Sequence, residues 1–238
     1  MAAQWASGHF VPGLYGGGLS VVGVSARHYR RWGNEVSEAE IEAARADAAG
    51  KVAMFRGMTV TAESFNRYDA GVFGFVAEFR AEIDLDDADS SGFAQRLSFD
   101  PARDVLVLDF ATLVRFTYPV ALPGLNVYGG NTGANGRPGW TYGRGIPVIE
   151  GHIVAAGFSQ NRVQFRDTVT ASAQDAAARL VAGISTTVET VIVDLAGQGS
   201  VTYIRSSSAG RLSGFRVLEF WVDPATLSVY TLAVAVRP

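Results

Sequence analysis

The stretch ATLVRFTYPVA at 111–121 recurs as ATLSVYTLAVA at 225–235. Six of the eleven positions are identical, whereas composition alone gives roughly one identity in a window of this length. Phe116 aligns with Tyr230 as a conservative pair, and the offset between the two stretches is 114 residues. A match of this quality near the ends of the two halves of a chain indicates an internal repeat.

Two more matches lie earlier in the chain. The stretch VVGVS at 21–25 resembles AAGFS at 155–159 with an offset of 134, and 44–53 aligns with 172–181 with an offset of 128. Two copies that differ in loop length require offsets that fall in order, and these fall from 134 to 128 to 114. The chain is therefore predicted to be a tandem duplication. The predicted segments are a Gly-rich arm at 1–18, a first repeat at 19–125, a Gly/Asn-rich linker at 126–148 and a second repeat at 149–238.

Each predicted repeat has the order strand, helix, then several strands. Ser37 and Glu40 form a capping box that opens a helix to about Phe55, with Gly57 at its exit, and a second helix is predicted over 168–184. The fold class is therefore α+β, with two pseudo-repeated units that are each a mainly antiparallel sheet with a helix packed on one face. Strands are predicted at 21–25, 72–80, 153–158 and 186–193, and in a hairpin with arms at 215–222 and 227–234.

Composition limits the classes of function. The 238 residues carry a net charge of −3 without a dense basic cluster, which argues against a nucleic-acid groove or a polybasic membrane patch. Cysteine is absent, so disulfides, thiolate metal sites and a cysteine nucleophile are excluded. Apolar residues make up 48% and charged residues 18%, an apolar balance that suits contact with another protein surface. No window reaches the length of a membrane span, and the first residues do not resemble a signal peptide.

The closing segment EFWVDPATLSVYTL at 219–232 resembles the hairpin of the bacterial lipoprotein-20 family, which includes the flagellar proteins FlgP and FlgT. The stretch IEGHIVAAG at 149–157 and the Ala-rich helix after it are similar to the entry strand and helix of that family. The resemblance covers about 150–236 directly and 19–121 only through the repeat. It implies a non-enzymatic, lipoprotein-like envelope protein that assembles with copies of itself or with a larger machine, as flagellar rings do. The chain departs from the family pattern because it lacks the lipid-bearing cysteine.

The residue types that carry chemistry give weak signals. His9, His28 and His152 lie in separate regions without acidic residues at metal-ligand spacing, so no catalytic residue, cofactor or firm metal site is predicted. The strongest metal candidate is a calcium loop with Asp87, Asp89 and Ser91 as ligands, but its twelfth position is a serine instead of a bidentate glutamate. Ser206-Ser207-Ser208 is interpreted as a solvated turn. Asp47 and Asp175 align in the two helices, and both are interpreted as exposed helix residues or as partners of a nearby arginine.

Two classes of function remain. The first is a structural protein of the bacterial cell envelope, at the periplasm or outer-membrane surface, that forms a homo-oligomer or joins a flagellum-associated assembly; a cytoplasmic location stays open. The apolar residues Trp5, Phe10 and Tyr15 of the Gly-rich arm are the predicted interface. Trp221 and Tyr230, which face each other across the closing hairpin, are interpreted as packing residues. The alternative is a small-molecule or calcium-dependent enzyme or binding protein with its site between the two repeats.

Overall fold

The computed structural model describes residues 13–15, 18–26, 36–69, 75–86, 91–107, 111–121, 125–128, 137–143, 145–163, 165–195 and 199–238. The first half of the chain contains β1 (Gly13–Tyr15), β2 (Gly18–Ala26), α1 (Glu38–Arg56), β3 (Met58–Asp69), β4 (Phe75–Leu85), α2 (Ser91–Ala94), β5 (Val105–Val107) and β6 (Ala111–Ala121). The second half contains β7 (Val127–Tyr128), the short 3₁₀ helix η2 (Gly139–Tyr142), β8 (Val148–Ile149), β9 (His152–Ser159), α3 (Phe165–Ala182), β10 (Thr187–Leu195), β11 (Gly199–Leu212), β12 (Arg216–Val222) and β13 (Val229–Val236).

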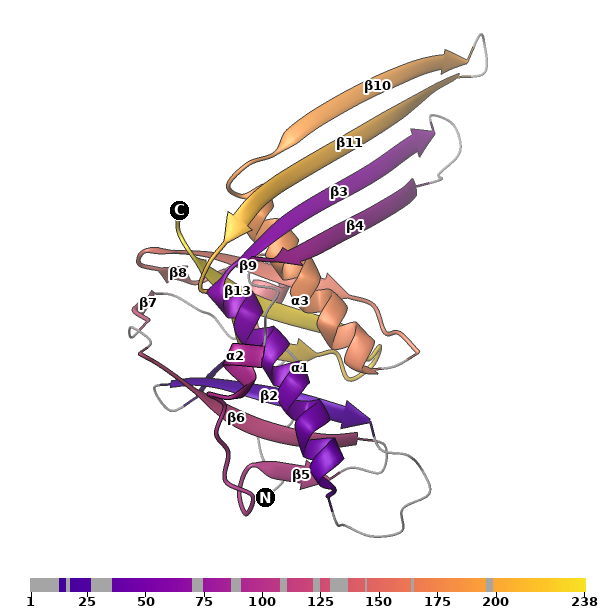
Figure 1. Cartoon of the computed structure of the whole chain (residues 1–238). Coiled ribbons are helices and arrows are strands. Elements are labelled where there is room, and N and C mark those ends of the chain that lie inside the picture. The colour runs from indigo at the N-terminus through magenta and orange to yellow at the C-terminus, as the bar shows by residue number, and fades with distance from the viewer. Residues whose placement is uncertain are drawn as a thin grey trace.

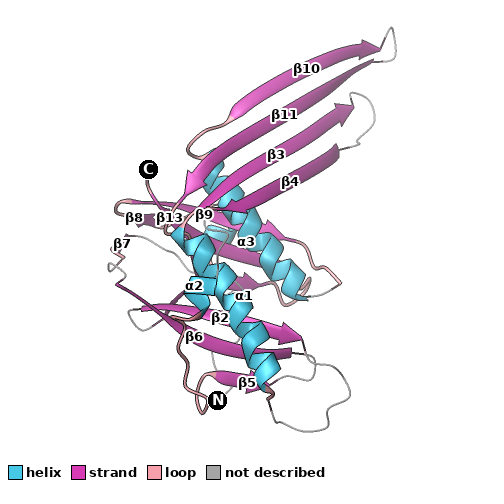
Figure 2. Cartoon of the chain, in the orientation of Figure 1, coloured by secondary structure: helices cyan, strands magenta, loops and turns pink. Residues whose placement is uncertain are grey.

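The described strands form three sheets. The large sheet has the order β5-β6-β2-β1-β12-β13-β9, a second sheet has the order β10-β11-β3-β4, and β7 pairs with β8. All pairings are antiparallel except the bridge between β1 and β12, where Gly13 faces Val217. Helix α1 packs on β2 and β6, α3 packs on β9 and β13, and the long strands of the second sheet extend away from the helices (Figures 1 and 2). No helix in the described part of the chain is long and apolar enough to cross a membrane.

The α+β class, the antiparallel sheets and the helices are confirmed. Ser37 accepts a hydrogen bond from the Glu40 N–H and the Glu40 side chain accepts one from the Ser37 N–H, so α1 begins with the predicted capping box. Helix α3 begins at Phe165, three residues before its predicted start. The predicted closing hairpin is present, with arms at Arg216–Val222 and Val229–Val236, the second of them two residues later than predicted, and Trp221 pairs with Tyr230.

The strands are distributed differently from the prediction. Each half was expected to form its own sheet, but the large sheet combines β5, β6 and β2 of the first half with β12, β13 and β9 of the second. The four-stranded sheet likewise joins the hairpin β3–β4 to the hairpin β10–β11. Sharing both sheets covers strand edges that two separate units would leave exposed to solvent. The segment predicted as a linker includes β7, η2 and the first residue of β8.

The two halves have the same order of paired strands. In the first half the helix follows β2, the hairpin β3–β4 follows the helix, and β6 pairs with both β5 and β2. In the second half the helix follows β9, the hairpin β10–β11 follows the helix, and β13 pairs with both β12 and β9.

The predicted match of Phe116 with Tyr230 is wrong. Phe116 is fully buried in the cluster beneath α1, whereas Tyr230 packs against Phe158 and Trp221. The strand pairings show why. Val24 and Phe158 match each other at the offset of 134, and Val24 faces Leu113 while Phe158 faces Tyr230. Leu113 of β6 therefore matches Tyr230 of β13, which is an offset of 117, not 114. Alternate residues of a strand point to opposite faces, and an odd change in offset exchanges those faces.

The serine run was also misassigned. Ser206, Ser207 and Ser208 lie inside β11, opposite Ser64, Glu63 and Ala62 of β3, and Ser208 is buried. A serine run is tolerated there because β11 has strand partners on both sides, so backbone hydrogen bonds hold it in place.

Two glycines bring the helices close to the large sheet. A Cβ atom on Gly23 of β2 would lie 1.8 Å from the carbonyl oxygen of Ala44 in α1, and one on Gly157 of β9 would lie 2.1 Å from that of Ser172 in α3. Such distances are far inside van der Waals contact, so these two positions exclude any side chain. Small helix residues opposite the glycines, Ala44 and Ala176, complete the close packing and are fully buried.

Candidate functional site

The two halves of the chain meet along a long junction in the second sheet, where β3 of the first half pairs with β11 of the second. Strands β3 and β11 pair antiparallel along the whole of β3, from Met58 opposite Leu212 to Asp69 opposite Val201. Two ion pairs reinforce the junction from the second half: Arg205 to Glu63, and Arg211 to Asp86, each with a nitrogen–oxygen distance of 2.7 Å. All four side chains are at least partly exposed, so each pair contributes at most about 1 kcal/mol. The backbone pairing and the packing beneath it therefore carry the junction.

The packing beneath the junction mixes residues from both halves. Met58 and Val60 of β3 lie in one buried cluster with Leu180 of α3, Leu212 of β11 and Phe215. These side chains are at most 2% exposed. Burying an aliphatic or aromatic side chain of this size contributes about 1.5–3 kcal/mol. Helix α3 of the second half therefore packs against strand β3 of the first half.

An ion pair on α1 occupies the edge of β2 beyond the point where β1 ends. Strand β1 pairs with β2 only at 18–20. Further along, the Val24 N–H donates to Asp47 Oδ2 at 2.8 Å, and Lys51 Nζ donates to the Val22 carbonyl at 2.7 Å. Lys51 also donates to Asp47 at 2.7 Å. The pair thus satisfies one donor and one acceptor that a neighbouring strand would otherwise bind.

The corresponding place in the second half has the same kind of contact. Strand β9 is the last strand of the large sheet, and its Phe158 N–H donates to Asp175 Oδ2 of α3 at 2.8 Å. Arg179 donates to the same oxygen at 2.9 Å. In both halves the N–H belongs to the residue after the close-packed glycine, Gly23 or Gly157. Sequence reasoning matched Asp47 with Asp175 and assigned them a structural role, but it missed these contacts with the strand backbone.

A groove lies between the two helices. It has a volume of about 440 Å³, and α1, α3 and β4 all contribute to its lining. Asp47 and Lys51 contribute its charged groups, and both already bind each other and the edge of β2. The apolar contribution includes Met54, Ile83 and Leu85. The groove is therefore mostly apolar, with one ion pair that could orient a polar end of a ligand.

The second sheet ends in two long strands. β4 and β10 are its outer strands, and in the described residues no other strand pairs with their outer edges. They run over 75–85 and 187–195. An outer strand presents unpaired backbone N–H and C=O groups, which makes it a template for another strand. These two edges are the parts of the fold best suited to pair with another chain.

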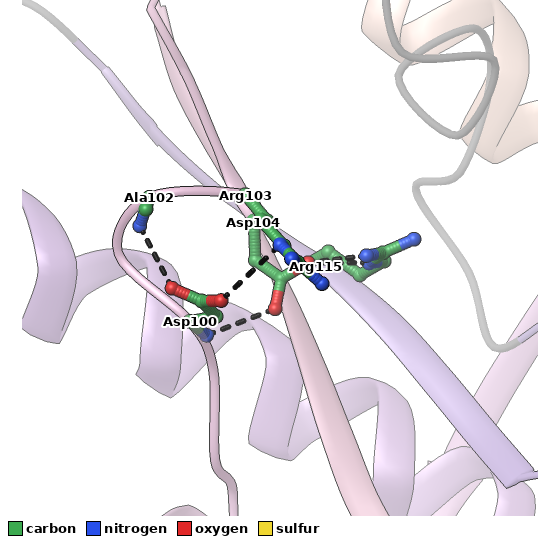
Figure 3. A network of polar contacts seen from close by, with 5 residues as sticks. All are labelled: Asp100, Ala102, Arg103, Asp104 and Arg115. Carbon is green, nitrogen blue, oxygen red and sulfur yellow. Dashed lines mark hydrogen bonds and ion pairs between the residues drawn. The ribbon is translucent and has the colours of Figure 1, made fainter.

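The far end of the large sheet is a short strand that is fixed from within. Asp104 accepts hydrogen bonds from the Arg115 side chain and, through its second oxygen, from the Asp100 N–H at 2.9 Å (Figure 3). Asp100 accepts a further bond from the Ala102 N–H at 3.0 Å and lies 3.8 Å from Arg103. This network lies just before β5, which has only three residues. The β5 edge therefore offers much less backbone than β4 or β10.

An aromatic cluster lies next to the closing hairpin. The Arg137 guanidinium lies 4.0 Å from the ring centre of Tyr142, 4.9 Å from that of Trp221 and 4.7 Å from that of Tyr230. Trp140 of η2 is buried and donates from Nε1 to Glu219 at 3.0 Å. The predicted packing role of Trp221 and Tyr230 is confirmed, since their ring centres are 5.5 Å apart.

The predicted site residues are only partly within the described chain. Trp5, Phe10, Asp87, Asp89, His9 and His28 lie outside the described residues. Tyr15 belongs to β1, which pairs inside the chain with β2 and β12, and Ser91 is the first residue of α2. Within the described ranges, no three His, Asp or Glu side chains gather in a way that could hold a metal ion.

Arg216 is a buried residue that the sequence did not reveal. It is 2% exposed, and burial lowers the pKa of its guanidinium. Its polar contacts are with the Gly214 carbonyl at 3.4 Å and with His152 Nε2 at 3.1 Å, while its Nε has no partner among the described residues. His152 Nδ1 lies 2.7 Å from the Glu150 carbonyl, which fits a proton on Nδ1 and leaves Nε2 to accept from Arg216.

No family model matches the chain, and neither the curated proteins nor the solved structures contain a match.

Proposed function

We propose that this chain is a tandem duplication of one α+β unit and that it works as a non-enzymatic assembly subunit of the bacterial cell envelope. The duplication is supported by the identical order of strand pairings and by the matching contacts of Asp47 with Val24 and Asp175 with Phe158. The envelope setting is supported by the sequence resemblance to the lipoprotein-20 family alone. A flagellum-associated or other surface assembly is the setting that this resemblance favours.

The junction between the halves is the observation that carries the assembly role. The two halves associate by pairing β3 with β11 and by burying a common core beneath that pair. A unit that binds its sequence neighbour through strand edges already has the chemistry for binding further units, because backbone pairing requires no particular side chain. Self-association through the same kind of contact is therefore the function that the geometry supports best.

Light scattering on the purified, intact chain tests the proposal. We expect species whose masses are integer multiples of 25.3 kDa and whose fraction rises with protein concentration. A mass of 25.3 kDa at every concentration, including the highest that stays soluble, would contradict self-association.

The groove between α1 and α3 favours a second candidate function, the binding of a small, mostly apolar molecule. Its position between the halves and its volume of about 440 Å³ suit a small ligand. Native mass spectrometry of freshly purified protein tests this candidate. A bound small molecule that disappears when Gly50, which lines the groove, is replaced by Trp would support it, and a ligand-free mass would argue against it.

A further inference from the structure

The internal junction joins unlike edges. Strand β3 is the first strand after the helix of its half, whereas β11 is the second strand after the helix of the other half. The strand that corresponds to β3 in the second half is β10, and the strand that corresponds to β11 in the first half is β4. A contact between unlike surfaces is head-to-tail, and it leaves one copy of each surface without a partner. The unused surfaces here are the outer edges of β10 and β4.

We propose that β4 of one copy pairs antiparallel with β10 of the next copy and so repeats between chains the β3–β11 junction inside the chain. This inference rests on the proposed self-association and names its contact. The occupant of each edge is a second copy of this chain. Inside the chain β3 binds an edge of β11, and β10 corresponds to β3 as β4 corresponds to β11. The edge of β10 in one copy therefore has its matching surface on β4 of another copy. A head-to-tail contact of this kind extends into a ring or a filament, depending on the rotation between successive copies.

The large sheet is less suited to the same extension. Asp175 occupies the Phe158 N–H on the edge of β9, and Arg179 binds Asp175. At the opposite end, β5 has three residues and is fixed by the network around Asp104. The inter-chain contact is therefore assigned to the second sheet, where β4 runs over eleven residues and β10 over nine.

The internal register predicts which residues meet. Thr59 of β3 faces Arg211 of β11, and Thr59 also faces Asp84 of β4. The offset of 128 between the helices relates Thr59 to Thr187, which faces Ser207, so Asp84 corresponds to Ser207 with an offset of 123. Because Thr61 faces Ala209 of β11, the same two offsets place 189 of one copy opposite Asp86 of the next. The same register places 191 opposite Asp84 and aligns 189–195 with 80–86.

Cysteine cross-linking tests this pairing directly, because the chain contains no cysteine of its own. The variants are Asp84→Cys, Val191→Cys and the double variant. Asp84 and Val191 belong to the two outer strands of one sheet, and those strands are three strand spacings or roughly 14 Å apart. The residue of β4 that is level with Val191 is Val76, eight residues from Asp84, so the two positions are further apart still. A disulfide requires Cα atoms within about 7 Å, so it cannot form inside one chain. After oxidation under assembling conditions, we expect a covalent ladder from the double variant and monomer from each single variant on a non-reducing gel.

The matched control is Thr61→Cys with Val191→Cys. Thr61 is exposed on the same sheet but lies on the inner strand β3, so this pair should give no ladder. Dimers from either single variant would show a contact between like edges and overturn the head-to-tail assignment. An assembled mass by light scattering without a ladder from the double variant would overturn this contact and leave self-association standing. A monomeric mass would overturn both.

Discussion

The carboxylate of Asp175 accepts a hydrogen bond from the backbone N–H of Phe158 at 2.8 Å, and this contact fixes α3 against the last strand of the large sheet. Asp47 makes the same contact with the Val24 N–H of β2, also at 2.8 Å. In both places a helix side chain binds a strand edge that would otherwise be open. The pair of contacts explains why the large sheet ends at β9 and how β2 is completed beyond β1.

Removing the acceptor should destabilise the fold. Asp175→Ala leaves the Phe158 N–H without its partner and removes the contact with Arg179, so we expect a loss of about 1–3 kcal/mol in the free energy of unfolding. Asp175→Asn keeps an oxygen that can accept the same bond, and it should lose less. Urea unfolding followed by circular dichroism measures both variants. Equal losses for the alanine and asparagine variants would show that the hydrogen bond to Phe158 is not what matters.

The glycines under the helices should not tolerate a methyl group. Gly23→Ala and Gly157→Ala place a Cβ atom about 2 Å from a helix carbonyl oxygen, so the helix must move. We expect losses of about 3 kcal/mol or more, or failure to fold. Gly50→Ala is the matched control in α1, since a Cβ there meets nothing within 4 Å. It should raise the stability by about 0.5–1 kcal/mol. Thermal unfolding of the three variants compares them, and a tolerated Gly157→Ala would contradict the close packing.

The burial of Arg216 should lower the stability of the fold. Its guanidinium is buried, burial lowers its pKa, and no carboxylate compensates its charge within the described part of the chain. The lowered pKa is that of a base, so the unfolded state binds the proton more strongly and the penalty persists at neutral pH. Arg216→Met should therefore raise the free energy of unfolding by about 1–4 kcal/mol, whereas Arg216→Lys should not. A strongly destabilised methionine variant would show that the contacts with Gly214 and His152 outweigh the cost of burial.

Salt should promote assembly. The segment 80–86 carries three acidic residues and one arginine, and 187–195 carries two acidic residues, so both proposed edges are acidic. Their repulsion is screened as the Debye length falls from about 30 Å at 0.01 M salt to about 8 Å at 0.15 M. We expect the apparent dissociation constant from light scattering to fall several-fold over this range. The variant Glu82→Gln with Asp84→Asn should assemble more readily at low salt and respond less to added salt. A dissociation constant that rises with salt would contradict the pairing of two acidic edges.

The local elements could be predicted from the sequence because their signals are local. Ser37 and Glu40 are three residues apart, and the turn between Trp221 and Tyr230 is short enough for the hairpin to be recognised from alternation. The sharing of sheets could not be predicted, because β3 and β11 pair across more than 130 residues and backbone pairing leaves no specific residue signature. The same holds for Asp47, whose partner Val24 belongs to a strand 23 residues earlier.

The misassigned pair Phe116 and Tyr230 shows a limit of matching two similar stretches of sequence by identity alone. Six identities favoured an offset of 114, but the strand pairings follow an offset of 117. A count of identical residues takes no account of which face of the strand each side chain points to, whereas the burial of each side chain reports that face directly. Phe116 faces the core beneath α1, and the position that corresponds to it by pairing is Ala233, which is also fully buried.

Hydrogen–deuterium exchange on the intact chain, at a concentration where it is monomeric and at one where it is assembled, tests the central claim most directly. The inner strands β3 and β11 should be protected at both concentrations, because they have partners on both sides within the chain. The amides of β4 and β10 should exchange quickly in the monomer and become protected together as the mass rises above 25.3 kDa. If the mass rises while exchange in β4 and β10 stays unchanged, the copies associate through another surface and the head-to-tail account is wrong.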